Sequence, residues 1–245
     1  MQRLPLSQRN IILKIYKSIK TVIQIKQVVI LCLLSLFICS GCALFSSPKK
    51  EKSAQELADL GMKEFNKGNY SYAVEHFEKL KDWYPFSKLA ILAEIKIADS
   101  HYQLKEYEEA VLAYEQFESL HPRNEKIPYV LYQIARCYYD RIGTIDRDQT
   151  PARNALHAFN RLMKQFPANR YYRQSEAYIE KCLRSLAEQE LYVGRFYFKT
   201  KQYKAALYRF KAVISDYPDL GVNWQALQYI LLCEDILKEK KNKTL

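Results

Sequence analysis

The stretch EYEEAVLAYEQFESLHP, residues 106–122, decides the fold. It places a small residue, Ala110, four positions before Tyr114 and seven positions before Phe117. Residues at i, i+4 and i+7 lie on one face of an α-helix, so these side chains form an apolar stripe. Pro122 follows five residues after the stripe and predicts the end of the helix, because proline cannot continue it.

The same spacing occurs four times along the chain. The four sets are Ala73, Phe77, Leu80 and Pro85; Ala110, Tyr114, Phe117 and Pro122; Ala155, Phe159, Leu162 and Pro167; and Ala206, Phe210, Val213 and Pro218. Each alanine is preceded by a second small residue, which is Gly61, Ala98, Ala135 or Gly194. Two helices that each present a small residue can approach closely, so each set predicts a helical hairpin. Hairpins repeated in this way are typical of tetratricopeptide repeats, whose period is about 34 residues.

The prolines recur at steps of 37, 45 and 51 residues, so the repeats are loose. An ordinary helical bundle with alanine and aromatic residues in its core is the alternative, but it gives no reason for proline to recur in phase. We therefore predict an all-α protein: an α-solenoid of four tetratricopeptide-like helical hairpins and a terminal capping helix. The capping helix would cover the open end of the array.

The expected elements can be placed along the chain from turn and cap signals. Thr150 is expected as the N-cap of a helix that begins at Pro151, after an interruption at 142–150. Only one glycine and no proline occur from 171 to 201, which predicts one unusually long helix. The expected segments are hairpins at 54–84 and 87–120, a helix from about 129 to 139, a helix that starts at Pro151 and whose end Pro167 marks, helices at 171–201 and 203–216, and a capping helix at 224–237.

The first 41 residues have the pattern of a secretory signal. They contain six basic and no acidic residues, followed by an apolar run at 28–38 that is too short to span a bilayer. Ser40, Gly41 and Cys42 then resemble a bacterial lipobox, which implies acylation of Cys42 with palmitate-type chains. We expect a lipoprotein signal peptide at 1–41, a lipidated flexible tether at 42–53 and the tetratricopeptide repeat domain at 54–245. An uncleaved anchor with an incidental cysteine is the alternative.

The composition that remains after this cut excludes some functional classes. Without the signal the chain has 32 Lys+Arg against 27 Asp+Glu, an ordinary surface that gives no case for nucleic acid. Cys137, Cys182 and Cys233 have no paired spacing and are expected to be buried. We find no histidine spacing typical of a metal site, no phosphate loop and no nucleophile motif, so we predict no enzyme, no metal and no cofactor.

The combined pattern resembles the BamD (ComL) family of lipoproteins from the outer-membrane β-barrel assembly machinery. The resemblance is carried by Tyr84-Pro85-Phe86, by 107–122, by 128–132, by Asp146-Arg147-Asp148 with Ala152-Arg153, and by 216–219. It implies a lipid-anchored scaffold on the periplasmic face of the outer membrane of a Gram-negative-type bacterium. Its N-terminal repeats would meet unfolded outer-membrane proteins. Its C-terminal repeats would dock a periplasmic domain of a BamA-type barrel protein, giving a hetero-oligomer.

The candidate client-binding residues come from the first helices of the hairpins, which line the concave face of such an array. They are Asp99, Tyr102, Tyr132, Arg136 and Tyr139. Tyrosine rings can cover apolar side chains, while hydroxyls and a guanidinium can meet a peptide backbone or a terminal carboxylate. Packing between helices is the alternative role for each of them.

Three further residues are candidates with open alternatives. Tyr84 and Phe86 either cap the first hairpin or contact a client. Arg209 stands where the family pattern also places arginine, and it either docks the partner or is simply solvated. The alternative function is a repeat lipoprotein that scaffolds other envelope or peptidoglycan-linked proteins, and the remaining alternative is an unrecognised hydrolase.

Overall fold

A computed structural model describes residue 20, residues 24–27 and residues 51–243. The chain divides into two units, Met1–Glu51 and Lys52–Leu245, and the helical array lies in the second. The helices are α2 (Ala54–Asn66), α3 (Tyr70–Trp83), α4 (Lys88–Gln103), α5 (Tyr107–Leu120), α6 (Ile127–Tyr139), α7 (Thr150–Gln165), α8 (Tyr172–Lys199), α9 (Tyr203–Asp216) and α10 (Asn223–Lys243). The predicted signal peptide, Cys42 and most of the tether lie outside the described residues. Within the described part, no helix has both the length and the apolar character needed to cross a membrane.

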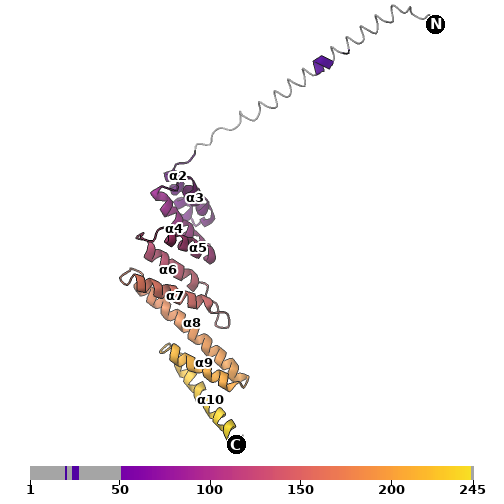
Figure 1. Ribbon diagram of the computed structural model, residues 1–245, viewed down its shortest axis with the longest axis vertical. Helices are drawn as coiled ribbons and strands as arrows, with labels where there is room; N and C mark the ends of the chain where they lie inside the picture. The colour runs from indigo at the N-terminus through magenta and orange to yellow at the C-terminus, as the bar shows by residue number, and fades with distance from the viewer. Residues whose placement is uncertain (1–19, 21–23, 28–50, 244–245) are drawn as a thin grey trace, which may run out of the picture. The chain divides into compact units, whose positions relative to one another are not determined.

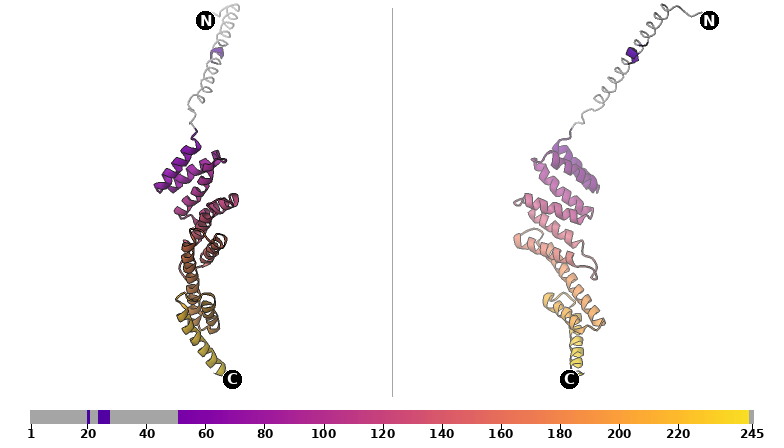
Figure 2. Two further views of the ribbon diagram at one scale, coloured as in Figure 1. Left: turned by 90° about the vertical axis from the view of Figure 1, so that its left-hand side faces the viewer. Right: turned by 45° about the vertical axis from the view of Figure 1, so that its right-hand side comes forward.

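The helices form consecutive antiparallel hairpins, as the sequence predicts. The pairs α2–α3, α4–α5, α6–α7 and α8–α9 follow one another in chain order, and α10 packs on α9 (Figures 1 and 2). No strand occurs between residues 51 and 243. The predicted all-α solenoid of four hairpins and a terminal helix is therefore confirmed. The terminal helix is longer than the predicted 224–237, because it continues to Lys243.

Small residues allow the two helices of a hairpin to pack closely, but their partner is the aromatic residue of the repeat. A Cβ atom at Gly61 would lie 2.6 Å from Cε1 of Phe77, and a Cβ atom at Gly194 would lie 2.6 Å from Cε1 of Phe210. Both phenylalanines are fully buried. The absence of a side chain on the first helix thus makes the space that the ring of the second helix fills.

Replacing Gly194 by alanine tests this packing. Strain from overpacking costs about 1–3 kcal/mol, and it opposes a gain of about 1 kcal/mol in helix propensity. The two contributions leave a net loss of up to about 2 kcal/mol, measured as a lower melting temperature of the full chain. In a Phe210→Leu background the same change should become neutral or stabilising, because the clash is gone. Equal effects in both backgrounds would contradict the packing role of the glycine.

Three hairpins share one turn geometry. Gly68, Lys105 and Lys201 all occupy the second position of a three-residue turn and have φ values of 81°, 64° and 61°. This left-handed conformation favours glycine, yet in two of the three turns the residue that adopts it is lysine. The turn is therefore set by the packing of the two helices that it joins.

The third hairpin replaces the short turn with an ordered loop. Gln149 is fully buried: its Nε2 donates to the carbonyl oxygens of Thr144 (3.0 Å) and Arg147 (3.3 Å), and its Oε1 accepts from Ser185 Oγ on α8 (2.8 Å). The predicted N-cap is corrected, since Thr150 is the first residue of α7 and Gln149 precedes it. Instead, Asp148 Oδ1 accepts from the backbone nitrogen of Thr150 (3.1 Å).

The long helix predicted between 171 and 201 is confirmed as α8, which has 28 residues. It contributes to two hydrophobic cores. Cys182 belongs to the core of α4 to α7, whereas Leu191 belongs to the core of α9 and α10. Figure 1 shows α8 running from beside α7 to beside α9. The helix therefore carries the array across the region where the repeat spacing lengthens.

The three cysteines of the array are buried and free, as predicted. Cys137, Cys182 and Cys233 each have no exposed surface. Burial raises the pKa of the Cys137 and Cys182 thiols to about 12, so neither is a reactive thiolate at neutral pH. They act as small apolar side chains of the core.

Candidate functional site

Asp99 lies at the centre of a buried polar network and not on an open surface. Its Oδ1 accepts hydrogen bonds from the hydroxyls of Tyr114 and Tyr129, both at 2.6 Å, and its Oδ2 pairs with Lys96 Nζ at 2.7 Å. Only 5% of Asp99 is exposed. Burial, followed by the Asp99 charge, raises the pKa of Tyr129, so its hydroxyl remains a donor. The expectation that Asp99 faces a groove is corrected: it joins α4, α5 and α6.

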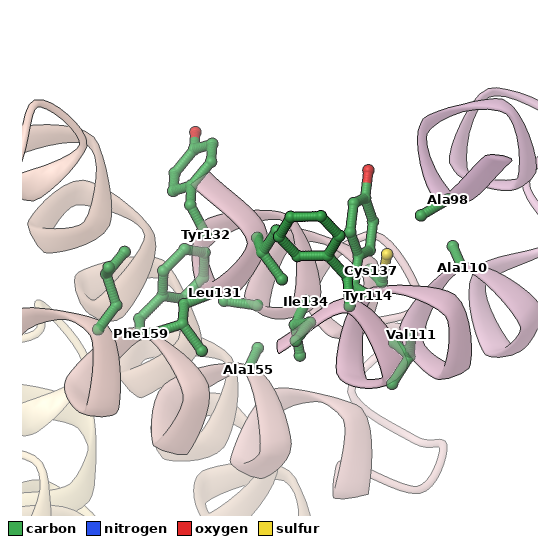
Figure 3. Close-up of a cluster of buried hydrophobic side chains, with 14 of the residues drawn as sticks. Ala98, Ala110, Val111, Tyr114, Leu131, Tyr132, Ile134, Cys137, Ala155 and Phe159 are labelled. Carbon is green, nitrogen blue, oxygen red and sulfur yellow. The ribbon is translucent and has the colours of Figure 1, made fainter. Parts of the chain in front are cut away.

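Tyr132 is also covered by neighbouring helices. Its ring stacks on Tyr171 with centroids 4.6 Å apart and meets Phe159 edge-on at 6.0 Å. Figure 3 shows the Tyr132 ring beside Phe159, with its hydroxyl directed away from that ring. With 7% exposure, Tyr132 packs in the core, so its predicted place on the concave face is corrected as well.

A half-buried cluster around Arg136 joins the first helices of the second and third hairpins. Arg136 Nη2 donates to the Tyr102 hydroxyl (2.8 Å) and to Asp140 Oδ2 (3.2 Å), and the Tyr102 hydroxyl donates to the same carboxylate. The guanidinium also lies over the ring of Tyr178, 4.9 Å from its centroid. Burial and the Asp140 hydrogen bond raise the pKa of Tyr102, which therefore stays protonated.

The cluster borders an open pocket between the end of α6 and the middle of α8. The pocket is lined by Tyr139, Asp140, Ile142, Lys181 and Ser185. Arg136 Nε is buried and has no acceptor among residues 51–243. The surroundings of the pocket thus combine aromatic rings, two cations and one carboxylate. Such a set can bind an extended peptide through stacking and charge-assisted hydrogen bonds.

Tyr178 is a member of this cluster that the repeat pattern did not single out. Its ring stacks on Phe159 at 5.3 Å with an interplanar angle of 2°, and Lys181 Nζ lies 5.3 Å from its centroid. It lies in the first half of α8, outside the Ala–aromatic–Pro spacing. The sequence did contain a signal for Tyr178: it follows Phe159 at the same separation at which Tyr229 follows Phe210.

Tyr84 and Phe86, although close in sequence, have different surroundings in the structure. Tyr84 packs against the core of the first hairpin, and its hydroxyl donates to the Lys52 carbonyl oxygen at 2.9 Å. Phe86 is fully exposed, at 102% of its reference area. Tyr84 therefore closes the end of the hairpin, while Phe86 is free to contact another molecule.

Arg209 makes an ion pair within the fourth hairpin. Its Nη1 donates to both carboxylate oxygens of Glu190 on α8, at 3.1 and 3.0 Å. The hydrogen bond with Glu190 raises the pKa of Arg209. The side chain remains 38% exposed, so one edge of the guanidinium can reach a partner while the ion pair holds its position.

Comparison with known proteins identifies relatives over most of the array. A protein called outer membrane protein assembly factor BamD from Rickettsia prowazekii is 32% identical over 191 residues, which cover 76% of each chain. The protein of that name from Neisseria gonorrhoeae is 29% identical over 194 residues and 73% of each chain. The one from Caulobacter vibrioides is 31% identical over 165 residues, and this chain spans only 54% of its length.

A tetratricopeptide repeat protein of known structure from Parabacteroides merdae aligns with a TM-score of 0.40 and 16% identity, over 78% of this chain and 76% of its own. The family model described as "YfiO: Outer membrane lipoprotein" matches residues 50–244. With the similarity to the BamD proteins, this match covers the whole helical array. The chain belongs to the YfiO/BamD family of outer membrane lipoproteins.

Proposed function

We propose that this protein is a non-catalytic scaffold of the outer-membrane β-barrel assembly machinery. It would bind unfolded outer-membrane proteins and a BamA-type barrel protein, and so promote folding and insertion. The observation that carries the proposal is the half-buried Arg136 cluster, set in an array that belongs to this family. The names of the relatives support an assembly role.

The client site would be the pocket beside Arg136. Tyr102 and Tyr139 would cover an aromatic side chain, and Arg136 with Lys181 would attract a terminal carboxylate. Asp140 would repel that carboxylate if it were free, but it is engaged by Tyr102 and Arg136. Asp99 and Tyr132 would hold the helices in place without touching the client. Phe86 would be a second contact for the client, because its whole side chain is exposed.

Partner docking would use the C-terminal hairpins. Arg209 is oriented by Glu190 and retains an exposed edge that suits a carboxylate or a backbone carbonyl of a periplasmic domain. Mutating a charged residue at the rim of an interface changes the rate and the salt dependence of association more than the affinity. The effect of reversing the charge at Arg209 should therefore be measured as a change in the rate of association with the barrel protein.

Crosslinking mass spectrometry on intact cell envelopes tests the proposed partners. We expect crosslinks from α8 and α9 to a large barrel protein with periplasmic domains, and crosslinks from α6 to unfolded barrel clients. Crosslinks confined to peptidoglycan-linked proteins would replace the proposal with the alternative envelope scaffold. Isolation of the chain alone, under mild detergent and after crosslinking, would contradict it.

The proposed lipid anchor predicts the effect of replacing Cys42 by serine. Without acylation the chain would lose the hydrophobic attachment that two or more acyl chains provide. We expect the variant to move from the membrane fraction to the soluble periplasmic fraction, as measured by fractionation and immunoblotting. A Cys39→Ser variant is the matched control and should remain at the membrane. Continued membrane attachment of the Cys42→Ser chain would mean that the lipobox is not used.

A further inference from the structure

The helix α4 is held on two sides along the same turns. Ala93 and Ile97 belong to the core of the first hairpin, while Ile95 and Ala98 belong to the core of α4 to α7. The contacts with the preceding helix and with the following helices thus alternate within one short stretch. Packing of this kind fixes the orientation of one hairpin relative to the next.

The long helix α8 is held differently, with one core at each end. Cys182 packs in the core of α4 to α7, whereas Leu191 packs in the core of α9 and α10. Two residues between them, Leu186 and Ala187, are buried but belong to neither core. The stretch 183–190, called the junction below, therefore separates the first three hairpins from α9 and α10 (Figure 1).

Within residues 51–243, the second half of α8 lacks the cover that the corresponding helices have. Phe196 follows the small residue of its repeat by two positions and is 56% exposed. Ser100 and Cys137 hold the same place in α4 and α6, and they have no exposed surface. The packing that buries this position in the earlier repeats is thus missing in the fourth, so it cannot fix the orientation of the fourth hairpin.

The ordered loop of the third hairpin is bonded to the junction instead. The fully buried Gln149, which directly precedes α7, accepts a hydrogen bond from Ser185 Oγ at 2.8 Å. One turn further along α8, Gln189 Nε2 donates to the carbonyl oxygen of Arg147 at 3.4 Å. The loop thus ties two successive turns of the junction to the start of α7.

Hydrogen bonds within the loop fix its own shape. Gln149 Nε2 donates to the carbonyl oxygens of Thr144 and Arg147, and the backbone nitrogen of Arg147 donates to the Thr144 carbonyl at 3.0 Å. The backbone carbonyl of Gln149 accepts from the nitrogen of Arg153 at 3.1 Å, in the first turn of α7. Displacing a buried amide with three partners would leave polar groups unpaired, so the loop resists deformation.

We propose that this loop is a brace that sets the direction in which α8 leaves the third hairpin. Long helices bend readily, and regions with few buried contacts move most easily. The brace opposes bending at the junction and so fixes the distance of α9 from the first three hairpins. Arg209 on α9 and the pocket beside Arg136 lie on opposite sides of the junction, so the brace also sets the distance between them.

The size of the motion that the brace prevents follows from the length of the free arm. From residue 190 to Lys199 the arm spans about 15 Å, at about 1.5 Å per residue. A bend of about 20° at the junction would displace the end of the arm, and α9 with it, by about 5 Å. Such a displacement broadens the distribution of distances between two spin labels.

Pulsed electron spin resonance on the full chain in detergent micelles tests the brace. Spin-labelled non-natural amino acids replace Asn160 on α7 and Lys204 on α9, which are both exposed, so the native cysteines are left untouched. The double variant Ser185→Ala/Gln189→Ala removes both bonds from α8 to the loop and leaves those within the loop intact. We expect the α7–α9 distance distribution to broaden by about 5 Å.

Two controls separate the brace from general loosening. Labels at Glu115 on α5 and Asn160 on α7 both lie in the first three hairpins, and their distance distribution should not change in Ser185→Ala/Gln189→Ala. The variant Arg184→Ala/Glu188→Ala places two alanines in the same junction, and neither side chain bonds to the loop within residues 51–243, since Arg184 pairs with Glu180 on α8. It should leave both distributions as they are.

Three outcomes would overturn the proposal. An unchanged α7–α9 distribution in Ser185→Ala/Gln189→Ala would show that the loop does not hold the junction. Equal broadening of the α5–α7 pair would show that the loop supports the third hairpin alone. Equal broadening in Arg184→Ala/Glu188→Ala would assign the effect to α8 itself. None of these results depends on the role in barrel assembly, so this proposal and the proposed function fail separately.

Discussion

Replacing Asp99 by alanine is expected to destabilise the array by about 3–5 kcal/mol, the cost of removing one partner of a buried charged network. The change leaves the hydroxyls of Tyr114 and Tyr129 without their acceptor and separates Lys96 from its counter-charge. For a domain of this size, that loss corresponds to a melting temperature lower by roughly 6–20 °C. Circular dichroism of the full chain in detergent micelles would measure it.

Two further variants test whether the loss of stability comes from the hydrogen-bond network or simply from the removal of a carboxylate. Asp59→Ala removes an exposed carboxylate whose one donor within residues 51–243 is Gln55 on its own helix (2.9 Å), so it should cost less than about 0.5 kcal/mol. Adding Tyr114→Phe and Tyr129→Phe to Asp99→Ala should recover part of the loss, because the unpaired hydroxyls are removed. A melting temperature of Asp99→Ala equal to that of Asp59→Ala would show that the network does not hold the helices together.

Replacing Arg136 by alanine is expected to weaken client binding about 10- to 150-fold. A hydrogen bond to a charged group contributes about 1.5–3 kcal/mol, and that free energy corresponds to this range in Kd. The guanidinium is the group that links Tyr102, Asp140 and the ring of Tyr178 beside the pocket. Fluorescence anisotropy would measure the affinity for a short labelled peptide that ends in phenylalanine with a free carboxylate.

The controls for this prediction use a neighbouring cation and the peptide itself. Arg141 lies beyond the end of α6, where it pairs with Glu108 at 2.6 Å, so Arg141→Ala should change the affinity little. The Arg136→Lys variant keeps a positive charge beside Asp140. Its affinity for the peptide should lie between those of Arg136→Ala and Arg141→Ala. Amidation of the peptide should remove most of the difference between wild type and Arg136→Ala. If the amidated peptide binds as tightly as the free acid, Arg136 does not recognise a carboxylate.

The hairpins could be predicted from the sequence because their signal is local. Ala110, Tyr114 and Phe117 share one helix face through the geometry of a single helix, and Pro122 ends that helix through its own ring. The long helix α8 was predicted from the absence of proline between residues 171 and 201, and the burial of the cysteines from their lack of paired spacing. Thr150 was misplaced by one residue because Asp148 accepts the hydrogen bond from its backbone nitrogen, which the spacing before Pro151 does not reveal.

The candidate site was predicted only in part. The positions of Tyr102 and Arg136 follow from counting along their helices, and the structure brings these side chains together at 2.8 Å. Asp99 and Tyr132 were counted in the same way, but they are buried. Their exposure depends on Tyr129 and Tyr171, which lie 30 and 39 positions further along the chain. Helical periodicity carries no information about such distant neighbours.

By itself, the sequence determined a repeated hairpin, its boundaries and the family to which the chain belongs, because each of these is encoded in short-range spacing or in matched motifs. Only the tertiary structure decided which tyrosines support the array and which border a pocket. The reason is physical: a helix face becomes buried or exposed according to the helices that pack on it, and those helices come from remote parts of the chain.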